Sequence, residues 1–159
     1  MTAMRSLLGL LTSFVICFGA GLIGSAFTAR SVGDWYLGLS KPAWTPPSSV
    51  FGPVWTLLYS MMAVAAWLVW RQAGFAAAAF PLTLFVLQLL FNAGWSLVFF
   101  GLRMPGAAFV EITVLWVLIL ASTVSFWQRA PIAGYLMLPY LGWVSFAAAL
   151  NFALWRMNL

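Results

Sequence analysis

Residues 33–59 read Gly-Asp-Trp-Tyr-Leu-Gly-Leu-Ser-Lys-Pro-Ala-Trp-Thr-Pro-Pro-Ser-Ser-Val-Phe-Gly-Pro-Val-Trp-Thr-Leu-Leu-Tyr, the only long segment of the chain with polar character. They include Asp34, one of two acidic residues, and Lys41, the only lysine. Each of their four prolines fixes φ, lacks an N–H donor and favours extended geometry in the preceding residue. The sequence therefore predicts that residues 40–47 form a stiff, non-helical cover beside apolar helices, like the lid of a binding site.

The composition of the whole chain is that of a membrane protein. Of its 159 residues, 65% are hydrophobic and 6% are charged, whereas soluble domains carry about a quarter charged residues. The net charge of +5 comes from isolated basic residues and forms no cluster. Such a distribution is typical of anchoring at a membrane interface and not of nucleic-acid binding. We therefore expect a lipid bilayer as the environment and no nucleic-acid partner.

The residue types used in common hydrolytic and metal chemistry are scarce. The chain has no histidine, and Asp34 and Glu111 are its only carboxylates. A zinc site, a Ser-His-Asp triad or a catalytic carboxylate pair cannot be assembled from this set. The single cysteine, Cys17, cannot form an internal disulfide. We predict no metal site and no conventional catalytic residue.

Five segments are apolar enough to cross a bilayer, which takes roughly 20 residues. They cover residues 6–28, 49–70, 76–101, 107–127 and 132–155. The sequence predicts an all-α fold, a single integral membrane bundle of five transmembrane helices over residues 1–159, with a long structured loop at 29–48. A cleaved signal peptide at 6–28 is disfavoured, because this segment is longer than the usual apolar core of about 7–15 residues.

Aromatic and amide side chains recur at helical spacing on three of these segments, so each set shares one helix face. An apolar surface with few polar groups is typical of small-molecule sites, although the same residues could be contacts between helices. Tryptophans near the span ends are interpreted as interfacial belts. The three stripes are Trp55, Tyr59 and Met62; Gln88, Asn92, Trp95, Ser96 and Phe99; and Tyr140, Trp143, Ala147, Leu150, Asn151 and Leu154.

The pattern WYxxLxKPxWxPPxxVFxPVWxxLY at residues 35–59 resembles the first loop and second helix of the translocator protein / tryptophan-rich sensory protein family, also called the peripheral-type benzodiazepine receptor family. The resemblance extends from about residue 19 to Arg156. It implies a ligand cavity under the first loop, between the first, second, third and fifth helices. The matching positions are Trp55, Asn92, Trp143, Ala147 and Leu150, and we add Trp35, Trp44, Tyr59, Trp95 and Tyr140 to the predicted ligand-binding set.

The resemblance also implies the ligand class. Family members bind porphyrins, and a flat macrocycle would stack on indoles at about 0.5–1.5 kcal/mol per aromatic pair. Arg30, Lys41 or Arg103 could meet its propionates. No cofactor is obligatory; protoporphyrin IX, or haem held by stacking, is the expected ligand. Sterol or benzodiazepine-type ligands are further candidates, but Phe152 and Ala153 stand where the family's cholesterol motif has tyrosine.

We therefore predict a membrane receptor or sensor that binds flat apolar ligands under the 29–48 loop and modulates tetrapyrrole handling or a stress response. One alternative is a transporter of porphyrin-like or sterol ligands, for which Glu111 is the candidate coupling residue. Another is a light-dependent porphyrin-degrading enzyme, in which Trp35, Trp44 and Trp143 exchange electrons with the excited ring. We expect the protein in a bacterial membrane.

Small residues and charges suggest further contacts. The pairs Gly21–Ser25 and Ala20–Gly24 permit close helix approach. We interpret them as internal packing, with a dimer seam or a ligand-facing groove as alternatives, and we expect a homodimer. Glu111 is interpreted as the partner of Arg103, and Asp34 as the partner of Arg30 or Lys41.

Overall fold

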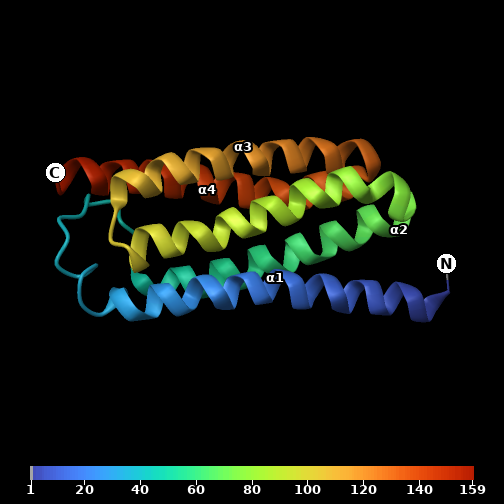
Figure 1. Ribbon diagram of the computed structural model, residues 1–159, viewed down its shortest axis with the longest axis horizontal. Coiled ribbons are helices and arrows are strands. Elements are labelled where there is room, and N and C mark those ends of the chain that lie inside the picture. Colours follow the sequence, from blue (N-terminus) through green and yellow to red (C-terminus); the bar gives the residue numbers. More distant parts are fainter. Residues whose placement is uncertain (1) are drawn as a thin grey trace.

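The structure is a computed structural model that describes residues 2–159, and it shows a bundle of long helices lying side by side (Figure 1). The helices are α1 (Ala3–Val32), α2 (Ser48–Ser96), α3 (Pro105–Arg129) and α4 (Pro131–Met157), and the π-helix η1 (Leu97–Gly101) continues α2. No strand occurs within residues 2–159. The all-α prediction is confirmed, and the apolar helices make the chain a multi-pass integral membrane protein.

The prediction of five transmembrane helices is wrong. Within residues 2–159 the structure has four helices that are long and apolar enough to cross a membrane, and one of them covers Ser48–Gly101. This helix contains both predicted segments 49–70 and 76–101, because the turn predicted between them is almost entirely helical. Only Gly74 leaves helical geometry there, with φ 72° and ψ 173°. Glycine adopts this left-handed φ readily because it has no Cβ.

The chain reverses direction at Gly74, so α2 folds back on itself. We call residues 48–73 its first arm and residues 75–96 its second arm. Figure 1 shows the two arms running side by side, with the reversal of α2 and the N-terminus at one end of the bundle. The C-terminus and the loop at residues 33–47 lie at the other end. This loop is shorter than the predicted 29–48 because α1 continues to Val32.

The loop is held by its own polar contacts. The Lys41 ammonium group donates hydrogen bonds to the carbonyls of Leu37 and Leu39, both at 3.1 Å, and lies 4.8 Å from the centre of the Tyr36 ring. Burial raises the pKa of the Tyr36 hydroxyl, so the ring under this cation stays neutral.

Two more contacts join the loop to helix ends. Ser40 N donates to Asn158 Oδ1 and Asn158 Nδ2 donates to Ser40 O, both at 2.9 Å. Asp34 lies 3.9 Å from Arg103, in the one ion pair found within the described part of the chain. The predicted pairing of Arg103 with Glu111, and of Asp34 with Arg30 or Lys41, is wrong.

Small residues let α1 approach α2, as the interpretation of internal packing requires. A Cβ at Gly21 would lie 2.6 Å from the Tyr59 ring, and one at Gly24 would lie 3.1 Å from Ser96 Oγ. At the other end of α1, a Cβ on Gly9 would collide with the Trp70 ring. The glycines of α1 therefore set how closely it packs against both arms of α2.

Candidate ligand-binding cavity

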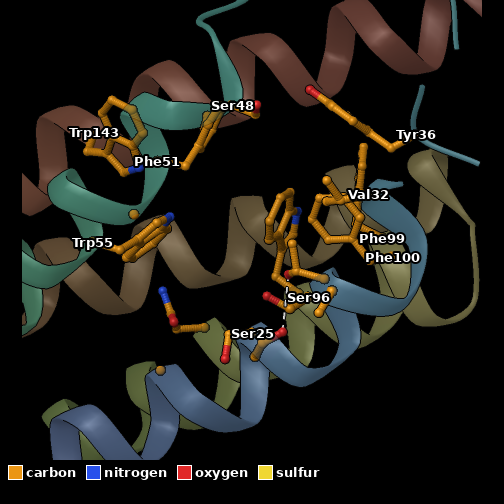
Figure 2. Close-up of a pocket in the computed structure, with 18 of the residues that line it drawn as sticks. Ser25, Val32, Tyr36, Ser48, Phe51, Trp55, Ser96, Phe99, Phe100 and Trp143 are labelled. Atoms are coloured by element: carbon orange, nitrogen blue, oxygen red, sulfur yellow. Dashed lines mark hydrogen bonds between the residues drawn. The ribbon is translucent and has the colours of Figure 1, made fainter. Parts of the chain in front are cut away.

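A cavity of about 520 Å³ lies at the loop end of the bundle, between α1, both arms of α2, η1 and α4 (Figure 2). Its volume falls within the range of about 300–1,000 Å³ that is common for small-molecule sites. Tyr36 from the loop is among the lining residues. No residue of α3 lines it within residues 2–159.

Aromatic rings line the cavity on opposite sides. Figure 2 shows Phe51, Trp55 and Trp143 on one side and Phe99 and Phe100 on the other. The rings of Phe51 and Trp143 are in edge contact, with their centroids 5.8 Å apart. Across the described residues 2–159, no aspartate, glutamate, lysine or arginine lines the cavity. These walls suit a flat, uncharged surface.

A buried hydrogen-bond network lies at one end of the cavity. Tyr59 OH donates to Asn92 Oδ1 at 2.5 Å, Asn92 Nδ2 donates to Tyr140 OH at 3.0 Å, and Tyr140 OH donates to Gln88 Oε1 at 2.8 Å. The network thus joins both arms of α2 to α4. Because a primary amide has two N–H groups and two acceptor sites, Asn92 keeps one donor and one acceptor position for a ligand.

The indoles of Trp55 and Trp143 add further hydrogen-bond donors to the cavity. A third indole, that of Trp95, is already engaged, because it donates to Asn151 Oδ1 at 2.9 Å. The indole N–H groups of Trp55 and Trp143, in contrast, have no hydrogen-bond acceptor among residues 2–159. Trp55 stacks on Tyr59 with 5.4 Å between ring centroids, so its ring is supported from behind. The cavity therefore offers apolar walls and a few N–H donors.

The structure brings seven of the ten residues predicted to bind ligand onto the cavity wall. Of the other three, Trp35 packs at the edge of Phe99 with centroids 5.7 Å apart, and Trp44 packs at the edge of Phe146 at 5.8 Å. Tyr140 is fully buried behind Trp55. These three support the wall without lining it, and direct ligand contact by any of the ten stays a prediction. The lining residues are Trp55, Tyr59, Asn92, Trp95, Trp143, Ala147 and Leu150.

The resemblance included the first helix among the walls of the cavity, but the predicted ligand-binding set names no residue of α1. Eight residues of this helix line the cavity, and they recur every three or four positions, as one helix face does. That spacing, together with the small residues Gly21 and Ser25, was the available signal for a ligand-facing groove. The residues are Phe18, Gly21, Leu22, Gly24, Ser25, Thr28, Ala29 and Val32.

The cations predicted to meet porphyrin propionates do not line the cavity. Lys41 and Arg103 are engaged in the loop contacts described above, and Arg30 is exposed at the end of α1. Glu111 also lies outside the cavity, and its carboxylate oxygens are buried without a hydrogen-bond partner among the described residues. A charged group of a ligand would therefore find no countercharge on the cavity wall, and it would have to point out of the cavity, toward the loop, to be solvated.

Comparison of the sequence with known proteins shows the family of this chain. The model of the TspO/MBR family matches residues 13–156. The chain is 40% identical over 153 residues to the tryptophan-rich protein TspO of Archaeoglobus fulgidus, covering 96% of this chain and 99% of that protein. It is 41% identical over 138 residues to the translocator protein of Homo sapiens, with 86% and 82% covered.

A third relative carries a name that refers to sensing. The tryptophan-rich sensory protein of Cereibacter sphaeroides is 39% identical over 125 residues, which covers 79% of this chain and 77% of that protein. The family match and these identities extend over most of the chain, including the lining residues of all the helices that form the cavity. The protein belongs to the TspO/MBR family.

Proposed function

We propose that this protein is a membrane receptor or sensor that binds porphyrins and other flat, largely apolar ligands in the cavity, and that it modulates tetrapyrrole handling or a stress response. Family membership and the names translocator protein and tryptophan-rich sensory protein among its relatives support a receptor or sensor role. The observation that carries the ligand class is the aromatic wall without a charged lining residue.

A flat, conjugated ligand fits the cavity in two ways, by stacking on the aromatic rings and by accepting hydrogen bonds from free N–H groups. Indole and phenyl faces on opposite walls stack on a conjugated ring system, and each aromatic pair adds about 0.5–1.5 kcal/mol beyond the area buried. The free N–H groups of Trp55, Trp143 and Asn92 can donate to acceptor atoms at the ring periphery. Sterol and benzodiazepine-type compounds share the apolar character and are secondary candidates.

The test is a titration of detergent-purified protein with protoporphyrin IX, followed by quenching of tryptophan emission. We expect saturable quenching, and a loss of affinity of at least tenfold in Trp143→Ala, or about 1.4 kcal/mol. Trp127→Ala is the matched control, because Trp127 lies at the far end of α3 and does not line the cavity. Linear quenching that neither variant changes would mean that porphyrin only partitions into the micelle.

We also propose a homodimer. Small residues on outward helix faces allow two membrane helices to approach closely. A Cβ at Gly19 on α1 would meet nothing within 4 Å. This glycine therefore leaves room on the surface of the bundle that a second copy of the chain can use.

A further inference from the structure

A second hollow lies at the opposite end of the bundle from the ligand cavity. It is a groove of about 820 Å³ between α1 and both arms of α2, next to the reversal at Gly74. It shares no lining residue with the ligand cavity. The groove is therefore separate from the site proposed above and needs its own explanation.

The long wall of the groove is apolar. From α1 it takes Leu8 and Ile16, and from the second arm of α2 it takes Leu82, Phe85 and Val86. Along α1 the groove runs from Arg5 to Ile16, which is about 16 Å at a rise of about 1.5 Å per residue. Half of a bilayer's hydrocarbon core is about 15 Å thick. The groove thus has the length of one acyl chain in one leaflet.

Two arginines line the groove at its outer end. Arg5 and Arg71 are both exposed, and neither has an ion-pair partner within residues 2–159. Trp67 contacts the chain beside both arginines. The Trp67 indole donates a hydrogen bond to the carbonyl of Ser6, the residue after Arg5, at 2.9 Å. The Arg71 guanidinium lies 5.0 Å from the centre of the Trp67 ring, so the two arginines lie at a similar depth along the bundle. Two guanidinium groups without an ion-pair partner among the described residues, at one end of a groove, are suited to a phosphate, which they can bind through paired N–H groups.

The charge around this end of the bundle is entirely positive. The two acidic residues of the chain, Asp34 and Glu111, lie in the loop and near the start of α3, at the other end. No carboxylate of this chain is therefore available to neutralise Arg5 and Arg71. An anionic group from outside the chain must balance them when this end sits at the membrane interface.

We propose that the groove binds one anionic glycerophospholipid, whose phosphate is held by Arg5 and Arg71 and whose acyl chain lies between α1 and the arms of α2. The shape and the charge are both needed for this assignment. A free phosphate would use only the arginines and leave the apolar wall uncovered. A second copy of the chain would bring three further arginines at the same end and no carboxylate.

Native mass spectrometry of the delipidated, detergent-purified chain tests the proposal. We expect a single phosphatidylglycerol to bind at least tenfold more tightly than phosphatidylcholine with the same acyl chains. The double variant Arg5→Gln/Arg71→Gln should lose this preference. The matched control is Arg30→Gln/Arg129→Gln, which also removes two exposed arginines but none from the groove. Equal losses in the two double variants would indicate diffuse attraction and overturn the proposal.

A second pair of variants tests the acyl-chain part of the groove. Thr12→Trp fills the groove and leaves both arginines in place, and we expect it to weaken phosphatidylglycerol binding at least tenfold. Thr113→Trp is the control, because Thr113 is also exposed, lies on α3 outside the groove, and its hydroxyl likewise donates to the carbonyl four residues earlier. Lipid binding that survives Thr12→Trp, or that millimolar inorganic phosphate displaces, would indicate an anion site without chain recognition and would overturn the proposal. If Arg5→Gln/Arg71→Gln changes the monomer–dimer ratio but not lipid binding, the groove faces a second copy of the chain, and the proposal is likewise overturned.

Discussion

The hydroxyl group of Tyr59 donates a hydrogen bond to Asn92 Oδ1 at 2.5 Å and so joins two residues that are 33 positions apart on the two arms of α2. Both side chains also line the ligand cavity. The same contact therefore holds the folded-back helix together and sets the position of the polar end of the site. Stability and ligand binding are coupled at this point of the fold.

Tyr59→Phe should destabilise the protein by about 1 kcal/mol, because it leaves the buried Asn92 oxygen without its donor. Thermal unfolding in detergent measures the effect. The control is Tyr135→Phe, since the Tyr135 hydroxyl is exposed and forms no hydrogen bond within residues 2–159. If the two variants unfold at the same temperature, the Tyr59–Asn92 bond does not stabilise the bundle.

Gly74→Ala should destabilise the protein by about 1–2 kcal/mol, because an L side chain is strained at the left-handed φ of 72°. A Cβ there would meet no atom within 4 Å, so the effect is one of backbone conformation alone. Gly142→Ala is the matched control: its Cβ also meets nothing, but it lies inside α4, where alanine is favoured over glycine. We expect opposite shifts in unfolding temperature for the two variants. Shifts of the same sign would contradict the reversal at Gly74.

The absence of cations from the lining residues predicts that the propionates of a porphyrin contribute little to its affinity. Protoporphyrin IX and its dimethyl ester should bind with dissociation constants within about threefold of each other, or about 0.6 kcal/mol. Tryptophan quenching compares the two ligands in the same detergent. A tenfold or larger advantage of the free acid would require a cation at the site, and Arg30→Gln would then identify whether Arg30 supplies it.

Gly19→Leu should weaken the homodimer without changing porphyrin affinity, because the added side chain projects from the surface that we propose for the second copy and does not line the cavity. Size-exclusion chromatography with light scattering measures the oligomeric state, and the quenching titration measures the ligand. Gly33→Leu in the loop is the control, since its Cβ also meets no atom within 4 Å. A dimer that is unchanged by Gly19→Leu would exclude this face of α1 as the interface.

The apolar segments were predictable from the chain alone, because a bilayer demands long apolar stretches and the four helices contain all the predicted spans, but the number of helices was predicted wrongly. The aromatic stripes were predictable for the same kind of reason. Helical periodicity places Trp55 with Tyr59, and Trp143 with Ala147, on common faces, and the structure puts these four residues on the cavity wall.

Periodicity describes one helix at a time, however, and does not say what lies opposite. Only the tertiary structure pairs Asn92 with Tyr59 and Tyr140, turns Trp35 and Trp44 to the outside of the cavity wall, and brings Arg103 to Asp34 instead of Glu111. It also joins two predicted helices into α2, because a single glycine at φ 72° reverses the chain without a longer turn.

Composition and local spacing were therefore enough to predict the lipid environment, the helical class and which side chains share a helix face. The partners of those side chains depend on contacts between segments far apart in the chain. Those contacts, including the one that selects which α1 residues line the cavity, form only when the helices pack together.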